Sequence, residues 1–289
     1  MEQDRINIQW YPGHMTKTRR QMEEDLKLVD AVCEIVDARI PVSSRNPDID
    51  AICGNKPRIV ILNRMDLADP AATKRWLTYF KSKGITAIAT DCKSRKGIAD
   101  FQPAVASVLH EKIARNAAKG MNKPMRVMIV GIPNVGKSTL INQISGRKGA
   151  KAENRPGVTR GKQWVTVNSS LLLLDTPGIL WPKFDDPEVG MMLAYTGAVK
   201  ENVIDIEELA AYFMQLLWRR YPETVKVRYG IDMPEDALGY ELLAAAGKKR
   251  GFLLARGEIH TERMAKVLMD EYRAGKLGRI TFEVPEELI

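Results

Sequence analysis

The sequence predicts an α/β fold with a mainly parallel sheet, followed by a small helical domain. Short apolar runs alternate with segments of helical periodicity through the first two thirds of the 289 residues, a pattern typical of strands joined by crossover helices. After about residue 202 the apolar residues recur mainly at helical spacing. The length allows one sizeable domain and a smaller one. We therefore expect a first domain at 1–185, a connector at 186–204 and a helical domain at 205–289.

Each element rests on a local pattern. Six apolar runs bounded by polar turns predict strands at Val32–Val36, Arg58–Leu62, Ile85–Ala89, Arg126–Val130, Gln163–Val167 and Leu171–Leu174. Helical spacing predicts helices between several of them, at Thr16–Val29, Ala71–Lys83, Ile98–Arg115 and Lys137–Ser145. A surface linker is expected at Ala114–Pro124. The last part of the chain has predicted helices at Ile206–Arg220, Ala237–Ala246 and Thr261–Arg273.

Composition narrows the class of protein. The chain is 45% apolar and 28% charged, as in ordinary globular proteins, and it has no apolar run of membrane-spanning length. Its first residues are acidic and polar, so we expect neither a secretory signal nor a transit peptide, and a cytoplasmic location. The three cysteines, Cys33, Cys53 and Cys92, have neither metal-ligand spacing nor a disulfide framework, which suits a reducing compartment.

Positive charge is concentrated in one stretch. The net charge is +8, yet the segment from Glu111 to Val165 alone holds twelve Lys or Arg against two acids. From Glu201 onward thirteen basic residues face sixteen acidic ones. A polyanionic partner, nucleic acid rather than membrane, is therefore expected mainly at the first domain. The alternative is a solvated positive face that aids solubility.

A glycine-rich loop predicts phosphate binding. The residues Gly131-Ile-Pro-Asn-Val-Gly136-Lys137-Ser138 follow a predicted strand and open a predicted helix, which is the context of a P-loop. Its backbone N–H groups and the helix N-terminus suit phosphate oxygens. Lys137 would reach the β- and γ-phosphates, and Ser138 would bind Mg²⁺. The nucleotide-binding residues expected here are Asn134, Val135, Gly136, Lys137, Ser138 and Thr139.

Two further segments belong to the phosphate end of the site. Asp175 stands at the tip of a buried strand, where a carboxylate is poorly placed unless it serves a metal ion, and we expect it to bind Mg²⁺. Gly178, in the same Asp-Thr-Pro-Gly turn, offers a backbone N–H to the γ-phosphate. Between this turn and the P-loop, Thr159 is the hydroxyl expected on Mg²⁺ when GTP is bound, although its Pro-Gly-Val-Thr sequence alone indicates only a turn. Lys137, Thr159 and Gly178 are the expected catalytic residues of this region.

Base recognition is predicted at Asn63-Arg64-Met65-Asp66, directly after a strand. The Asp66 carboxylate can accept hydrogen bonds from the ring N–H and the exocyclic amine of guanine, a pair that adenine lacks. Asn63 would hold the base and neighbouring loops, and Cys92 and Lys93 belong to a later loop whose backbone would touch the guanine oxygen. The sequence therefore predicts a Mg²⁺-dependent enzyme that hydrolyses GTP to GDP and phosphate.

The order of these motifs resembles that of the circularly permuted GTPases. The base motif at 63–66 and the loop at 90–94 precede the P-loop at 131–138, Thr159 and the turn at 175–178, whereas small GTPases normally place them last. Within that group, the chain resembles the bacterial ribosome-biogenesis GTPase A family. This resemblance rests on Trp10-Tyr-Pro-Gly-His14-Met15, on Asp37-Ala-Arg39-Ile-Pro41 and, more loosely, on Gly278-Arg-Ile-Thr-Phe-Glu283.

Three positions depart from the usual GTPase pattern. Arg64 replaces the lysine of the base motif, so the tightness of base binding is open while specificity is expected to survive through Asp66. Cys92 replaces a common serine, which leaves more of that loop's hydrogen bonding to its backbone. Ile179 stands where Ras-like enzymes carry the glutamine that orients the attacking water, so the unassisted rate should be low.

The resemblance implies what replaces that glutamine. His14 would swing toward the γ-phosphate on the ribosome and orient or deprotonate water, the alternative being a structural or RNA-contacting histidine. Asn134 resembles the residue that binds K⁺ in potassium-activated relatives, where the cation would supply transition-state charge.

The expected function is a GTP-hydrolysing factor that binds the immature large (50S) ribosomal subunit, through rRNA and ribosomal proteins, and promotes a late maturation step with ribosome-stimulated GTPase activity. We expect a monomer with no membrane partner, whose helical domain contacts RNA. One alternative is an rRNA-binding module that uses GTP mainly as a structural ligand. Another is a GTPase acting on a membrane or signalling partner, which the lack of a lipidation signal disfavours.

Overall fold

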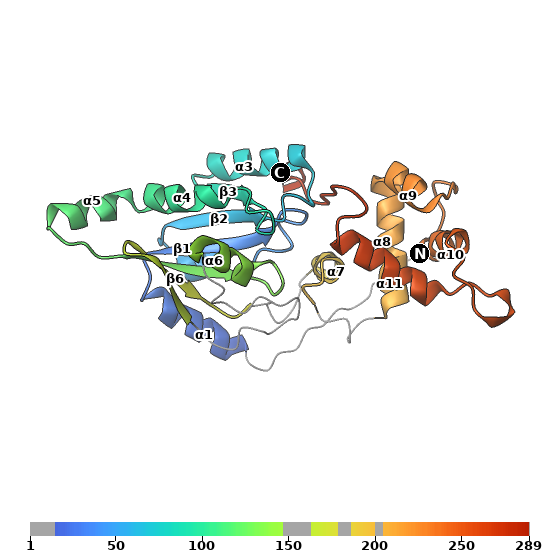
Figure 1. Ribbon diagram of the computed structural model, residues 1–289, viewed down its shortest axis with the longest axis horizontal. Coiled ribbons are helices and arrows are strands. Elements are labelled where there is room, and N and C mark those ends of the chain that lie inside the picture. The colour runs from blue at the N-terminus through green and yellow to red at the C-terminus, as the bar shows by residue number, and fades with distance from the viewer. Residues whose placement is uncertain (1–14, 147–162, 179–185, 200–204, 289) are drawn as a thin grey trace. The chain divides into compact units, whose positions relative to one another are not determined.

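The computed structural model describes residues 15–146, 163–178, 186–199 and 205–288. These residues form two compact units (Figure 1). The sheet unit contains the described residues up to 183 together with the last residues from Ile280, and the helical unit contains those from Phe184 to Arg279. The sequence-based division differs at two points. Residues 280–288 lie with the sheet unit and not with the helices that precede them, and the described residues 186–199 of the expected connector belong to the helical unit.

A six-stranded sheet forms the centre of the sheet unit, in the order β3-β2-β1-β4-β6-β5. Its strands are β1 Ala31–Asp37, β2 Arg58–Asn63, β3 Thr86–Thr90, β4 Met125–Gly131, β5 Gln163–Asn168 and β6 Leu171–Asp175. Every pairing is parallel except that of β5 with β6. All predicted strands are present, each within one residue of its expected bounds, and the predicted α/β fold with a mainly parallel sheet is confirmed.

The register brings the ends of these strands to one edge of the sheet. Asp37 pairs with Asn63, and Asn63 pairs with Thr90. On the other side of β1, Ile35 lies opposite Gly131, and Asp175 lies opposite Ile129. Loops that follow parallel strands therefore meet at this edge, where ligands of open α/β sheets bind.

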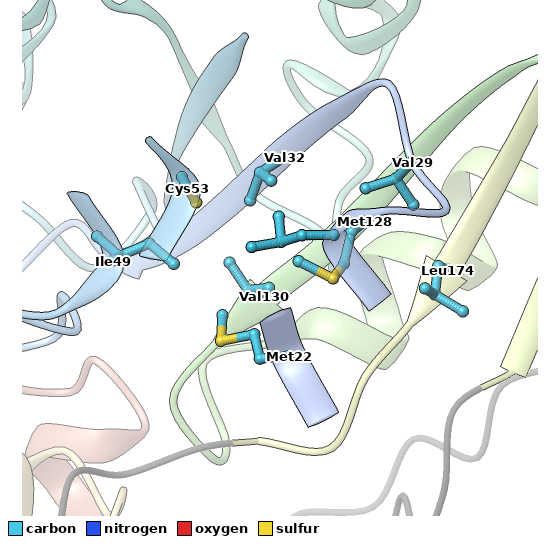
Figure 2. Packing of buried hydrophobic residues seen from close by; sticks show 9 residues of the cluster. Met22, Val29, Val32, Ile49, Cys53, Met128, Val130 and Leu174 are labelled. Carbon is cyan, nitrogen blue, oxygen red and sulfur yellow. The ribbon is translucent and has the colours of Figure 1, made fainter. Parts of the chain in front are cut away.

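One apolar cluster lies between the sheet and the helices α1 Met15–Leu26 and α2 Ile49–Cys53 (Figure 2). Side chains of alternate sheet positions, such as Val32, Met128 and Val130, face these helices because successive strand residues point to opposite faces. The cluster consists of Met22, Leu26, Val29, Val32, Ile49, Cys53, Met128, Val130 and Leu174.

Helix α3, Pro70–Ser82, covers the neighbouring strands. Asp69 begins it, and its carboxylate accepts hydrogen bonds from the N–H groups of Ala71 and Ala72, which satisfies donors that the first helical turn leaves unpaired. Trp76 and Phe80 of α3 then pack with apolar residues of β1 and β2. The end of β2 and the start of α3 are thus joined by a short loop, residues 64–69, that carries the base motif.

The predicted helix Ile98–Arg115 is divided in the structure. It becomes the 3₁₀ turn η1 Ile98–Asp100, α4 Phe101–Val108 and α5 His110–Ala118, with a break at Leu109, whose ψ of 13° is not helical. Leu109 at this break is buried. The expected linker is helical up to Ala118, and α6 Lys137–Ser145 has its predicted bounds.

The helical unit is built around α8 Ile206–Arg220, which contacts α10 Gly239–Lys249 and α11 Thr261–Arg273. Phe213 of α8 lies 4.5 Å from the ring of Tyr195 and 4.6 Å from the ring of Tyr272. The other elements are α7 Pro187–Tyr195, α9 Pro222–Tyr229 and the 3₁₀ turn η3 Ala255–Gly257; a last 3₁₀ turn, η4 Pro285–Leu288, belongs to the sheet unit. Helices α2, α7 and α9, of five, nine and eight residues, were not predicted. Among the described helices, none is long and apolar enough to cross a membrane.

Candidate nucleotide site

The phosphate loop joins the end of β4 to the start of α6. Gly136 precedes α6 with a φ of 106°, in the left-handed region that glycine adopts readily. A Cβ added there would lie 2.3 Å from Nδ2 of Asn63. Glycine is therefore required both by the backbone conformation and by the close approach of the base motif.

Lys137 is folded back over this loop. Its ammonium donates hydrogen bonds to the carbonyls of Gly131 at 2.9 Å and Ile132 at 2.8 Å. Burial lowers the pKa of Lys137 to about 8, while the Asp175 carboxylate opposes that shift. The buried Lys137 ammonium is held only by neutral carbonyls in these two bonds, so it is well placed to exchange them for phosphate oxygens. The negative charge of the phosphate would balance the positive charge of the ammonium.

Asp175 ends β6 beside Lys137. Its Oδ1 is buried and has no hydrogen-bond partner within the described residues. Burial raises the pKa of Asp175 to about 6, and the charge of Lys137 opposes this shift. An oxygen with an unused lone pair fits a divalent cation, and Ser138 in the first turn of α6 offers a second oxygen. No cluster of three His, Cys, Asp or Glu side chains appears in the described parts of the chain, so Mg²⁺ there would also need hydroxyl, water or phosphate oxygens.

Gly178 places the turn after β6 against the phosphate loop. A Cβ added to Gly178 would lie 2.9 Å from Nζ of Lys137 and 2.9 Å from both N and Cα of Pro133. These are contacts that real side chains do not make, so the turn approaches the loop with backbone only. Thr176 secures its other end by donating its hydroxyl to the carbonyl of Ile129 at 2.7 Å.

The base motif is tied directly to the phosphate loop. Asn63 is buried, and its Nδ2 donates to the carbonyl of Val135 at 2.7 Å while its Oδ1 accepts from the Thr90 hydroxyl at 3.1 Å. Arg64 donates from Nη2 to the carbonyl of Asn134 at 2.5 Å. The last residue of β2 and the residue after it therefore hold two carbonyls of the loop that follows β4.

Arg64 also lies near a buried ion pair. Its Nε is 3.8 Å from Oδ2 of Asp37. Arg39 binds the same carboxylate through Nε at 2.9 Å and Nη2 at 2.7 Å. Burial alone would raise the pKa of Asp37, but the charge and hydrogen bonds of Arg39 lower it below its usual value. Asp37 is thus a fixed anion at the end of β1.

The loop after β3 is organised by Asp91. Its carboxylate accepts from the N–H groups of Lys93 at 2.8 Å and Ser94 at 3.3 Å. The Thr90 carbonyl, one residue earlier, accepts from the N–H of Met65 at 3.1 Å and joins this loop to the base motif. Cys92 is buried and burial raises its pKa to about 11, so its side chain is a neutral thiol in the core. Any contact of Cys92 with a nucleotide would therefore use its backbone.

The described site residues all lie at or after the ends of strands that end at this one edge of the sheet. They are Asn63, Arg64, Asp66, Cys92, Lys93, Asn134, Val135, Gly136, Lys137, Ser138, Thr139, Asp175 and Gly178. The predicted residues His14 and Thr159 lie outside the described residues, as does Ile179. Sequence reasoning did not assign Asp37 and Asp91 to the site. Their signal was an acid at or just after the end of a buried strand, the same signal that pointed to Asp175.

Comparisons with known proteins agree with this geometry. The sequence family described as "50S ribosome-binding GTPase" matches residues 126–216, a match that starts in β4 and leaves the base motif outside and before it. The chain is 50% identical over 285 residues to ribosome biogenesis GTPase A of Priestia megaterium, which covers 98% of both chains. It is 33% identical over 281 residues to the protein of that name from Thermotoga maritima, covering 97% of this chain and 96% of the relative.

Two solved structures have the same fold. GDP-bound YlqF of Thermotoga maritima superposes with a TM-score of 0.66 at 28% identity, covering 92% of this chain and all of that one. GNP-bound YlqF from the same organism gives a TM-score of 0.64 at 28% identity, covering 93% and 99%. The first of these proteins is bound to GDP and the second to GNP.

A mainly parallel sheet that carries a P-loop after β4 and a guanine motif after the earlier strand β2 defines a P-loop GTPase with its motifs in permuted order. This protein is an enzyme of that class. With the full-length identities above, the chain belongs to the ribosome biogenesis GTPase A family.

Proposed function

We propose that this GTPase is an assembly factor that binds the immature large (50S) ribosomal subunit and promotes a late maturation step, with hydrolysis stimulated by that subunit. The observation that carries the proposal is the 50% identity, over 98% of both chains, to a protein named ribosome biogenesis GTPase A. The phosphate and base loops support it, because Lys137, Ser138 and Asp66 are residue types that binding of a guanine nucleotide uses.

The nucleotide is bound across the edge of the sheet. Asp66 accepts from the guanine N–H and amine, while Asn63 and Arg64 keep the base loop joined to the phosphate loop. The backbone at Cys92 and Lys93 contacts the guanine oxygen. The nucleotide thus contacts the loops after β2, β3 and β4. GTP and GDP therefore bind only when these three loops are correctly placed relative to one another.

The phosphate end supplies positioning and charge. Lys137 exchanges its two carbonyl partners for β- and γ-phosphate oxygens, and the Gly178 N–H faces the γ-phosphate. Ser138, Asp175 and Thr159 are the residues that would hold Mg²⁺, which neutralises phosphate charge when it is bound. The buried Oδ1 of Asp175, which has no hydrogen-bond partner within the described residues, supports this assignment.

Two roles complete the reaction. His14 orients or deprotonates the attacking water when the ribosomal subunit is bound, and Asn134 holds K⁺ beside the phosphates. His14→Ala should remove most of the subunit-stimulated rate while leaving GDP affinity unchanged; full stimulation in this variant would exclude His14 from catalysis. For Asn134, equal turnover in KCl and NaCl at the same ionic strength would exclude the cation.

RNA contacts are proposed on both units. In the helical unit, Lys248 and Lys249 are exposed at the end of α10 and available for phosphate. Arg250 has a structural role instead, because its guanidinium lies 3.3 Å from the Glu271 carboxylate and 5.4 Å from the centre of the Tyr229 ring. In the sheet unit the basic stretch 111–165 meets rRNA.

The decisive experiment measures GTP turnover with and without purified immature large subunits, with small subunits as the control. Stimulation of at least tenfold by large subunits alone would support the proposal. Salt-dependent co-sedimentation with large subunits in the presence of a GTP analogue, but not of GDP, would support the further proposal that the bound nucleotide controls binding to the subunit. Binding that is equal in both nucleotides, with no stimulation, would contradict it and favour an rRNA-binding module that uses GTP as a structural ligand.

A further inference from the structure

The last residues of the chain lie on the sheet unit, beside the loop that carries the base motif. Figure 1 shows the C-terminal end next to α3. Ile280, Thr281 and Phe282 are buried there, with 1%, 5% and 2% of their surfaces exposed. We call residues 280–283 the C-terminal strap. It lies more than 200 residues away in sequence from the loop it contacts.

Two hydrogen bonds join the strap to the backbone just after Asp66. The N–H of Ile280 donates to the carbonyl of Leu67 at 3.0 Å. The hydroxyl oxygen of Thr281 accepts from the N–H of Asp69 at 2.9 Å. Asp69 in turn begins α3, so these bonds hold the loop at the point where it enters the helix.

The strap is itself anchored on the opposite side. The N–H of Phe282 donates to the carbonyl of Arg39 at 2.9 Å. The Glu283 carboxylate accepts from the N–H of Val42 at 2.5 Å, and from both the N–H, at 3.1 Å, and the hydroxyl of Ser43. Its carbonyl accepts from Nε1 of Trp76 at 2.8 Å. The strap therefore bridges the loop after β1 and the loop after β2.

These anchors enclose the base motif from both ends. Asn63 and Arg64 fix the start of the loop to the phosphate loop. Arg39, whose carbonyl the strap binds, pairs with Asp37, which in turn lies 3.8 Å from Arg64. The strap fixes the other end of the loop, at Leu67 and Asp69. Between the two lies Asp66, whose carboxylate must be placed within a fraction of an ångström to meet two donors on one base.

We propose that the C-terminal strap positions the base-recognition loop, so that Thr281 and Glu283 are positioning residues for guanine specificity. The proposal rests on the proposed role of Asp66 in reading guanine. The hydrogen bonds of the strap described above fall on the loops after β1 and β2, so we expect its effect on nucleotide affinity and base discrimination and not on the chemical step.

The test compares GDP with inosine diphosphate, which lacks the exocyclic amine of guanine. Thr281→Val keeps the side-chain shape and removes the acceptor for the Asp69 N–H. We expect GDP affinity to fall roughly fivefold, as for the loss of one ordinary hydrogen bond. Affinity for inosine diphosphate should fall less, so the ratio of the two affinities drops. The KM for GTP should rise while kcat stays the same.

Further variants separate a positioning effect from a loss of structure. Glu283→Gln removes charge from the other anchor and should lower the same ratio. Glu286→Gln is the matched control, because Glu286 lies close in sequence to Glu283 and forms an exposed ion pair with Arg75, at 3.4 Å; it should leave both affinities unchanged. Equal falls for GDP and inosine diphosphate in Thr281→Val and Glu283→Gln, with a lower melting temperature, would show a structural role only and overturn the proposal.

Asp66→Asn distinguishes failure of this proposal from failure of the base-site assignment. If Asp66 reads guanine, this variant should lose roughly 100-fold in GDP affinity and most of its preference over inosine diphosphate. An unchanged preference in Asp66→Asn would refute the base site itself. A lost preference in Asp66→Asn with an intact preference in the strap variants would refute the strap alone.

Discussion

Arg64 offers a sharp test of how the base motif works in this chain. It stands where most GTPases have lysine, and its guanidinium donates to the Asn134 carbonyl at 2.5 Å, which ties the base loop to the phosphate loop. Arg64→Met removes the charge and the donors and keeps the unbranched stem. Arg64→Lys keeps the charge but offers a single shorter donor group. Both replacements face the same positive φ of 62°, so backbone strain does not separate them.

The expected loss follows from this one bond. A hydrogen bond from a charged group contributes about 1.5–3 kcal/mol, and the Arg64 side chain is 24% exposed, so the lower part of that range applies. The nearby Asp37 adds little, because Arg39 already binds that carboxylate twice. Without the bond, the nucleotide must bring the two loops together, and this appears as weaker binding. Arg64→Met should therefore weaken GDP binding roughly 10- to 30-fold, and Arg64→Lys roughly threefold.

Equilibrium titration with a fluorescent GDP analogue measures this loss, and stopped-flow dissociation shows whether it lies in koff. Arg95→Met is the matched control, since Arg95 also has a positive φ, 67°, but makes an exposed and longer bond of 3.4 Å to Gln143. It should change the affinity less than twofold. GDP binding by Arg64→Met within twofold of the parent would refute the view that this bond joins the loops.

Three other predictions concern the γ-phosphate and the two units. Gly178→Ala would place a Cβ 2.9 Å from the Lys137 ammonium, so single-turnover hydrolysis should fall at least tenfold, which is more than the accompanying loss of GDP affinity. Burial raises the pKa of Glu283 from 4.5 to about 6, so the folded state favours the protonated carboxyl group. The stabilisation by this protonated group is fully present below pH 4.5 and is lost as the pH rises through 6. The free energy of unfolding should thus decrease by about 2 kcal/mol over that window, and Glu283→Gln should abolish the decrease. In the helical unit, burial would raise the pKa of Glu271, but hydrogen bonds, first from Arg228, lower it; its stabilisation is present above pH 4.5 and is lost as the pH falls. Glu271→Gln should cost about 2 kcal/mol at pH 7 in urea titrations and reduce that acid sensitivity, and equal stabilities of variant and parent at pH 7 would contradict this.

The elements that local pattern determines were predictable from the sequence. Each strand of the sheet is a compact apolar run, and the long helices α8 and α11 combine regular spacing with clear ends, such as the Asp205 carboxylate that caps α8. The phosphate loop and the base motif were recognisable for the same reason, since each is a contiguous set of residues next to a strand. Even the permuted order of the motifs is a property of the sequence alone.

What joins these pieces was not predictable, because it depends on contacts between distant residues. Arg64 meets Asn134 across 70 residues, and Glu283 meets Val42 across 241. No local pattern indicates such a pair, since both partners are brought together only by the order and register of the parallel strands. Sequence alone therefore determined which chemical groups this GTPase carries and on which strands. Only the tertiary structure decided that residues 280–283 lie on the sheet unit beside the loop of the base motif, because the burial of Ile280 and Phe282 and the hydrogen bonds of Thr281 and Glu283 depend on contacts with residues more than 200 positions away.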